Sequence, residues 1–277
     1  MPDERRVVLK SRSQIERMAV AGELVAAVLD RLGEELRPGM TTLELDAIAE
    51  EMIRDTGAVP SFIGVPGRLA PFKHTLCVSI DDEIVHGVPG SKRIAEGQLI
   101  SIDAGAIVDG WHGDAARTWI VGDVPESASR LVDATERAMH AGIAAAVPGN
   151  YLSDISAAVE DVARESGYGI IRAFVGHGIG TEMHEEPQVA NYRTGSRGRR
   201  IEPGLCLAIE PMFTLGGHDV RILDDGWTVS TADGSLAAHW ENTIAVMTDG
   251  PIILTAANAS ASVAGAASPA GEPLSVR

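Results

Sequence analysis

The sequence has few of the features that mark secreted, membrane-spanning or redox-active proteins. It holds two cysteines among 277 residues, Cys77 and Cys206, and no CxxC pair, which excludes a cysteine-based zinc or redox motif and fits a reducing compartment. No apolar run approaches the roughly 18 residues that cross a membrane, and residues 1–10 are charged rather than apolar. We therefore expect a cytoplasmic protein whose thiols are unpaired.

Positive charge is also scarce. The chain has 23 Lys and Arg against 39 Asp and Glu, a net charge of −16, which argues against a bulk nucleic-acid partner. The basic cluster at 193–200 is interpreted as a solvated loop. The chain is 45% hydrophobic and 22% charged, which is typical of a globular domain with a substantial core. Residues 256–277 are rich in Ala, Ser, Gly and Pro, and we expect them to be a disordered tail.

The spacing of apolar residues predicts four helices. They cover residues 14–36, 41–57, 127–147 and 153–167. The second begins with a capping-box pattern from Thr41 to Glu44, which satisfies backbone N–H groups at a helix start.

The two helix pairs resemble each other. Pro38-Gly39 and Pro148-Gly149 break the first helix of each pair and are 110 residues apart, as are the helix stops Gly57 and Gly167. This indicates one helix–helix–strand unit used twice. We expect a single α+β domain over residues 1–255, with halves at about 13–121 and 127–250.

Each half carries two carboxylates near strand ends. Asp103 and Glu210 each stand six residues after the Gly that precedes an apolar strand, while Asp114 and Glu241 open the second strand of each half. A carboxylate buried there needs a partner or a cation, and Arg117 is the only basic residue within a few positions. Four acids and one imidazole would suit two divalent ions such as Mn, Fe(II), Co or Zn.

The segment GHGIGTEMHEEP at 176–187 could supply the nitrogen. Its three glycines in five residues exclude a stable helix interior and indicate close backbone approach, so His177 is a candidate ligand. The segment lacks the second histidine of HExxH, and His184 need not share the role of His177. Glu185 and Glu186 are interpreted as structural.

Several ordered motifs resemble the methionine aminopeptidases of the short bacterial type I class. They span about residues 9–255 and comprise IVHGVPG (84–90), ISIDAGAIVDGWHGDAART (100–118), GHGIGTEMHEEP (176–187), AIEPMF (208–213), DGWTV (225–229) and HWENTIAV (239–246). The resemblance implies the pita-bread fold, with a pseudo-twofold internal repeat and a central antiparallel sheet that carries helices on its outside.

The resemblance also implies a ligand set for two divalent ions, whose identity among Co, Mn, Fe(II) and Zn stays open. The ligands would be Asp103, Asp114, His177, Glu210 and Glu241, with Asp114 and Glu241 bridging. The ions would lower the pKa of a water, and Glu210 would take its proton as general base. His184 would stabilise the oxyanion, and His86 would contact the scissile amide nitrogen or the following backbone.

Specificity is expected to come from an apolar pocket for one thioether side chain. The resemblance assigns it to Phe72, Cys77, Met183 and Trp227, with Phe62 less securely placed. The segment at 61–77 departs from the family because it is longer, and Val65 stands where a tyrosine is usual.

The remaining histidines are interpreted more simply. His112 lies two residues before Asp114 and is expected to support the site. His74, His140, His218 and His239 are expected to be structural or exposed.

The implied function is removal of the initiator methionine from nascent polypeptides and peptides when the second residue is small. Its partners would be nascent chains and, transiently, the ribosome, with no membrane and no specific nucleic acid, and the protein would be a monomer. One alternative is an Xaa-Pro aminopeptidase or prolidase, but these carry a long N-terminal domain and only 102 residues precede Asp103. The other is a non-catalytic binding protein, against which the complete ligand set argues.

Overall fold

The computed structural model describes residues 7–266, and within them the chain forms five helices. They are α1 (Arg12–Glu35), α2 (Thr42–Asp55), α3 (Glu126–Ala145), α4 (Leu152–Ser166) and α5 (Ala259–Gly265). The four predicted helices are confirmed, with ends shifted by one or two residues. The capping box is present as predicted: Glu44 N donates to Thr41 Oγ1 at 3.2 Å, and Thr41 N donates to Glu44 Oε2 at 2.6 Å.

A nine-stranded sheet forms the centre of the described part of the chain, and every strand pairing in it is antiparallel. Its path runs β1 (Val59–Pro60), β4 (Gln98–Val108), β5 (Trp111–Val121), β14 (Glu241–Met247), β9 (Cys206–Ile209), β7 (Gly176–Gly178) and β8 (Glu185–Val189), with β2 (Leu76–Ile80) beside β4 and β15 (Gly250–Ile253) beside β14.

Two three-stranded sheets complete the described fold. One orders β13 (Ala237–His239), β10 (Met212–Thr214) and β6 (Gly169–Ile170), and the other orders β11 (Val220–Ile222), β12 (Val229–Thr231) and β3 (Glu83–Val85).

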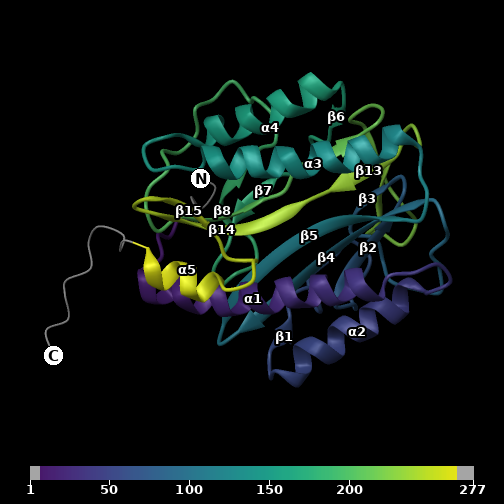
Figure 1. Cartoon of the computed structure of the whole chain (residues 1–277), viewed down its shortest axis with the longest axis horizontal. Coiled ribbons are helices and arrows are strands. Elements are labelled where there is room, and N and C mark those ends of the chain that lie inside the picture. Colours follow the sequence, from purple (N-terminus) through teal and green to yellow (C-terminus); the bar gives the residue numbers. More distant parts are fainter. Residues whose placement is uncertain (1–6, 267–277) are drawn as a thin grey trace, which may run out of the picture.

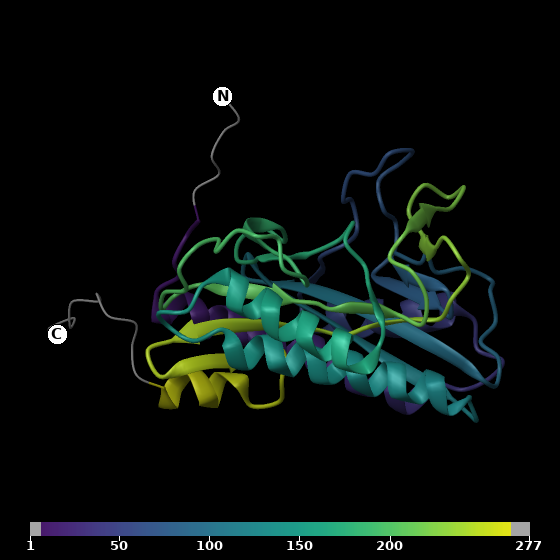
Figure 2. The same cartoon turned by 90° about the horizontal axis from the view of Figure 1, so that it is seen from above.

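The helices cover one side of the curved central sheet. In Figure 1, α1 and α2 lie below the strands and α3 and α4 above them, and Figure 2 shows the helices along one side with loops rising from the other. The α1–α2 pair packs on β2, β4 and β5 through residues such as Leu29, Ile53 and Ile102. The α3–α4 pair packs on β9 and β14 through residues such as Ile143 and Ile155. Burial of these apolar faces is the main stabilising term, and the predicted arrangement of an antiparallel sheet with outer helices is confirmed.

The internal repeat appears in the order of elements, because α1, α2, β4 and β5 correspond to α3, α4, β9 and β14. Its turns share a backbone conformation: Gly39 has φ +91° and Gly149 has φ +98°, a region that glycine enters without steric cost. The two halves meet where β5 pairs with β14.

The register of the sheet places the predicted carboxylates on one face. Asp103 on β4 pairs with Ala116 on β5, which pairs with Glu241 on β14. Residues directly opposite each other share a face, as do residues two apart on one strand, so Asp114 shares it as well. The methyl group of Ala116 leaves the space between Asp103 and Glu241 open to their side chains.

The expectation that disorder begins at residue 256 is wrong for residues 256–266. Ala259 and Val263 of α5 are buried against α1. Arg12 donates from its Nη2 to the carbonyl oxygens of Val263 and Ala264, at 3.0 and 2.6 Å. The composition misled because two small apolar residues four apart suffice to dock one helical turn. Residues 267–277 of the predicted tail lie outside the described part.

Docking of α5 can be tested with Val263→Ala. We expect it to lower the free energy of unfolding by about 1.5–3 kcal/mol, because it removes two fully buried methyl groups and leaves a cavity. Urea unfolding beside the exposed control Ala261→Ser measures the loss. Equal stability of the two variants would mean that residues 256–266 are not packed in solution.

Candidate active site

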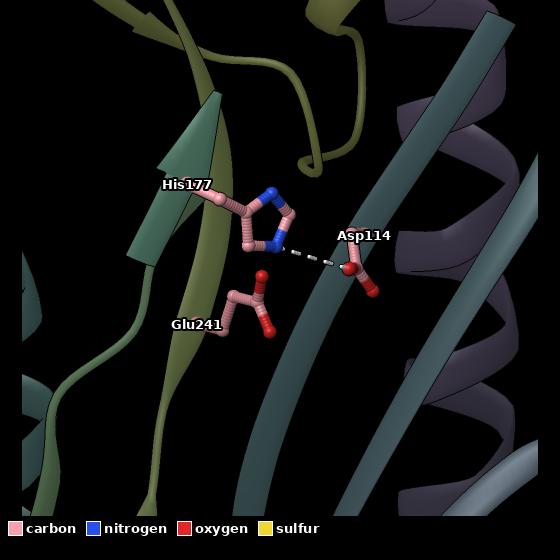
Figure 3. A group of neighbouring side chains, drawn as sticks. All are labelled: Asp114, His177 and Glu241. Atoms are coloured by element: carbon pink, nitrogen blue, oxygen red, sulfur yellow. Dashed lines mark ion pairs between the residues drawn. The ribbon is translucent and has the colours of Figure 1, made fainter. Parts of the chain in front are cut away.

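The structure brings the five predicted ligands to one cavity at the junction of the two halves. Asp103, Asp114, His177, Glu210 and Glu241 all line it. Figure 3 shows three of them, on β5, β7 and β14, pointing toward one another. Their donor atoms lie within 4.8 Å of one another.

His177 is oriented by its own backbone neighbours. It pairs with Ala208 of β9, which sets its place in the sheet. Its Nδ1–H donates to the carbonyl oxygen of Gly178 at 2.9 Å, which leaves Nε2 as a free acceptor. That atom lies 3.5 Å from Glu210 Oε1 and 3.9 Å from Asp114 Oδ2.

The glycines beside His177 permit close packing of β7. A Cβ on Gly176 would meet the carbonyl oxygen of Ala208, and one on Gly178 would meet that of Glu186. The glycine-rich sequence therefore allows strand contact on both sides of the histidine, as its composition indicated.

Burial controls the charges of the cluster. Burial raises the pKa of Asp103 to about 7, and burial together with neighbouring carboxylates raises the pKa of Asp114, Glu210 and Glu241 well above the ordinary range. Arg117 does not offset them, because it pairs with Asp30 of α1. The four acids therefore have no compensating side-chain cation among residues 7–266.

The histidines of the cavity are neutral at pH 7. Burial lowers the pKa of His177 to about 3 and that of His86 to about 4. Neutral imidazole is the form that binds metal ions.

The donor set fits divalent cations. Among residues 7–266, buried oxygens of Asp103, Asp114 and Glu241 have no hydrogen-bond partner. Unpaired buried carboxylate oxygens are costly unless a cation or proton satisfies them. Several carboxylates with one imidazole match the preferences of borderline and hard divalent ions.

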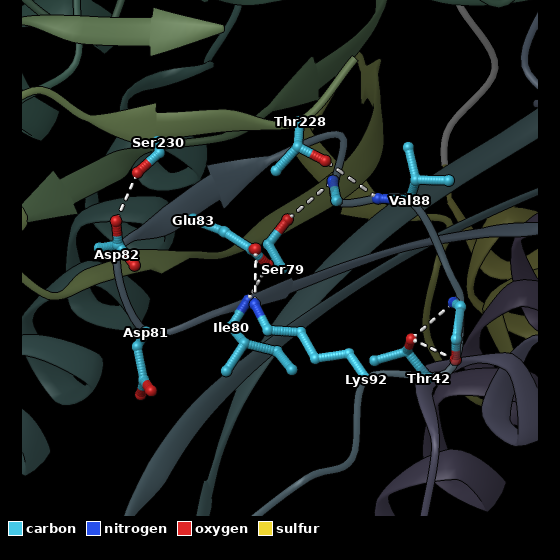
Figure 4. Close-up of polar contacts among 12 residues, drawn as sticks. Thr42, Ser79, Ile80, Asp81, Asp82, Glu83, Val88, Lys92, Thr228 and Ser230 are labelled. Carbon is cyan, nitrogen blue, oxygen red and sulfur yellow. Dashed lines mark hydrogen bonds and ion pairs between the residues drawn. The ribbon is translucent and has the colours of Figure 1, made fainter. Parts of the chain in front are cut away.

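His86 lies directly after β3, in a tightly held segment. Its φ of +59° is uncommon for a residue other than glycine, and a network shown in Figure 4 fixes the chain around it. Gly87 N donates to Ser79 Oγ at 3.1 Å, and Val88 N donates to Thr228 Oγ1 at 3.3 Å. Backbone strain of this kind persists only where the surroundings over-determine it.

An apolar compartment adjoins the carboxylates. It contains all four predicted pocket residues, together with Phe62 and Val65: Phe62, Phe72 and Cys77 are buried, and Val65, Val88, Met183 and Trp227 pack against them.

The long 61–77 segment closes over Trp227. The rings of Phe72 and Trp227 meet edge to face with centroids 5.0 Å apart, and Trp227 Nε1 donates to the carbonyl oxygen of Ala70 at 3.1 Å. Cys77 and Cys206 are both free, as predicted.

His184 lies beside the predicted ligands but stays exposed to solvent. Its ring centroid is 4.5 Å from that of His177, and it lines the cavity with His86. Its neighbour Glu185 accepts from Lys10 Nζ at 2.5 Å and from the backbone N of Thr181 at 2.9 Å, which agrees with a structural role.

His239 was expected to be structural or exposed, and it is buried. It is 2% exposed, and its Nε2 lies 3.8 Å from both Glu210 Oε2 and Glu241 Oε2. Its position two residues before Glu241 was the sequence signal for a place beside the carboxylates. His112 instead meets Ser61 Oγ through Nδ1 at 3.0 Å, while His74 pairs with Asp46 and His140 and His218 are exposed.

Fold and site together define a metal-dependent hydrolase on the pita-bread fold. The model of metallopeptidase family M24 matches residues 16–248, and the chain belongs to this family. It is 45% identical to the methionine aminopeptidase of Clostridium perfringens, over 90% of this chain and 98% of that one. It is 47% identical to methionine aminopeptidase 1 of Mycobacterium tuberculosis, over 91% of this chain and 96% of that one.

Solved structures agree. The methionine aminopeptidase from Rickettsia prowazekii matches with a TM-score of 0.87 and 34% identity, covering 91% of this chain and 100% of that one. The Xaa-Pro dipeptidase from Bacillus anthracis matches with a TM-score of 0.72 and 24% identity, covering 89% of this chain and 61% of that one. At this identity the match shows the shared fold alone. The Xaa-Pro alternative is therefore disfavoured.

Neutralising Asp103 is expected to stabilise the metal-free protein. Its folded pKa of about 7 lies above the ordinary value, so the folded state binds a proton more tightly and loses stability as pH rises from about 4 to 7. With chelator at pH 8, the free energy of unfolding of Asp103→Asn should therefore be about 1–3 kcal/mol higher than that of the parent. This gain in stability should shrink at pH 5.

The comparison needs denaturant melts at both pH values, with the exposed substitution Asp219→Asn as control. Excess divalent ion should reverse the order, because the parent alone keeps the full donor set. A variant that is no more stable than the parent at pH 8 would contradict buried, uncompensated charge at this position.

Proposed function

We propose that the protein removes N-terminal methionine from polypeptides whose second residue is small, by metal-assisted hydrolysis of the first peptide bond. The observation that carries the proposal is one cavity that joins the uncompensated carboxylate cluster to an apolar compartment. A free α-amine suits the acidic end, and an unbranched thioether suits the apolar end.

The site would hold two divalent ions through Asp103, Asp114, His177, Glu210 and Glu241, with Co, Mn, Fe(II) and Zn as candidates. Bound ions would supply Lewis-acid activation of the scissile carbonyl and of a water. Glu210 would accept the proton of the attacking water and pass it to the leaving amine. Its raised pKa suits this exchange.

The two histidines at the mouth would handle the peptide bond. His184 would donate to the carbonyl oxygen as negative charge develops there. His86, which lies near Trp227 with ring centroids 6.4 Å apart, would contact the amide nitrogen or the next residue's backbone.

The pocket would select methionine by size and softness. Cys77 and Met183 offer sulfur contacts, and Phe72 and Trp227 offer ring faces and edges.

The cellular setting is part of the proposal. No helix among the described residues is long and apolar enough to cross a membrane. We propose a cytoplasmic monomer that acts on nascent chains and contacts the ribosome transiently.

Turnover of matched peptides tests the activity. Metal-loaded protein is expected to release methionine from Met-Ala peptides, to spare Xaa-Pro peptides, and to lose activity on chelation and regain it when metal is returned. Methionine release that persists in full after chelation would refute the mechanism. Binding of the peptides without release would favour the non-catalytic alternative.

His184→Ala is expected to lower kcat by about 10²–10³-fold with a smaller change in KM, because the interaction develops in the transition state. Steady-state kinetics on Met-Ala peptides measure the separate changes in kcat and KM. Glu182→Ala, an exposed change in the same loop, serves as control. A rise in KM at constant kcat would show that His184 serves ground-state binding instead.

A further inference from the structure

A second buried imidazole approaches the carboxylate cluster. His177 Nε2 lies 3.5 Å from one carboxylate oxygen of Glu210, and His239 Nε2 lies 3.8 Å from the other. His239 Nε2 is also 3.8 Å from Glu241 Oε2. Glu210 therefore lies between two histidines.

The backbone holds His239 in this place. It ends β13, where it pairs with Met212. Its N–H donates to Thr118 Oγ1 at 2.9 Å, and the Thr118 hydroxyl donates to its carbonyl oxygen at 2.8 Å. The residue is 2% exposed, and within residues 7–266 its Nε2 has no hydrogen-bond partner. A rigid, buried ring with an unsatisfied nitrogen needs a partner that protein atoms do not supply.

The distances match those of a shared ion. Two donors at about 2.0–2.2 Å from one cation lie roughly 3–4 Å apart, a range that includes both contacts of His239. The ligand atoms of His239, Glu210 and Glu241 all lie within 4.8 Å of one another. The ligand atoms of His177, Asp114 and Glu241 do the same. Glu241 belongs to both groups, and each group contains one imidazole.

We propose that His239 Nε2 is an additional ligand of the divalent-ion centre, bound together with Glu210 and Glu241. The centre then carries two imidazoles rather than the single one of the five predicted ligands. This inference rests on the proposed metal centre and extends it. A second nitrogen donor shifts preference toward Co, Fe(II) or Zn and away from Mn, which favours oxygen ligands.

Counting coordinated imidazoles tests the proposal directly. In the full chain loaded with Co²⁺, each coordinated histidine gives one solvent-exchangeable, hyperfine-shifted N–H signal in proton NMR. We expect two signals from the parent and one from His239→Gln. The matched control His112→Gln, which removes a neighbouring buried histidine bonded to Ser61, should keep two.

Calorimetry gives a readout independent of turnover. His239→Gln is expected to weaken Co²⁺ or Zn²⁺ binding by about 10–100-fold, the range seen when residues that support a metal site are lost. Its Mn²⁺ affinity should fall less, so the ratio of Zn²⁺ to Mn²⁺ affinity should drop.

A single shifted N–H signal from the parent overturns the inference, and that measurement needs no variant to fold. Unchanged affinities in His239→Gln overturn it too, since the loss of a ligand must weaken metal binding. If the parent shows one signal but releases methionine, this inference alone fails. If it binds metal through two imidazoles but releases no methionine, the proposed function alone fails.

Discussion

Burial of four carboxylates without a side-chain cation from the described residues 7–266 is the constraint on which the rest of this structure depends. Charges of like sign at such short range are unfavourable in a low-dielectric interior, and the one nearby arginine, Arg117, turns away to Asp30. The chain maintains the cluster because a large hydrophobic framework fixes the strands that carry it. The resulting affinity for cations or protons sets the cavity apart from the core and makes it the candidate reaction centre.

The sheet register turns that constraint into geometry. Asp103, Ala116 and Glu241 lie in one row across β4, β5 and β14, and backbone pairing holds such a row more firmly than loops could. Loops supply the parts proposed to touch a substrate, including the segment around His86 and the segment over Trp227. Enzymes commonly place binding residues on loops and hold them in position with rigid strands and helices.

Much of this arrangement could be predicted from the sequence, and the reason is periodicity. The helices follow from apolar spacing, and the capping box at Thr41 follows from local hydrogen bonding alone. The four carboxylates stood out because a repeated unit placed them in equivalent positions. The strand ends expected at Asp103 and Asp114 were wrong, because β4 and β5 extend past both residues. The resemblance to a known family supplied the roles of His86, His184 and the pocket residues.

Other features depend on contacts between distant segments, which no local pattern reports. Residues 256–266 read as a disordered tail, yet Val263 docks on α1. His239 was expected to be structural or exposed, and only the packing of β13 beside Glu210 reveals its surroundings. The closure of the 61–77 segment over Trp227 likewise joins residues far apart in the chain. The sequence could therefore show that this segment is longer than is usual in the family, but not how it folds.

The pairing of β5 with β14 at the junction of the two halves has a consequence for biosynthesis. Asp103 and Asp114, on β4 and β5, are synthesised early, whereas Glu241 is synthesised late, on β14. A chain emerging from N-terminus to C-terminus holds an incomplete set of acids until both halves are present and docked. If the proposed metal centre holds, tight metal capture is thus withheld from fragments and truncated chains, and the ligand set is complete only when β14 joins the sheet.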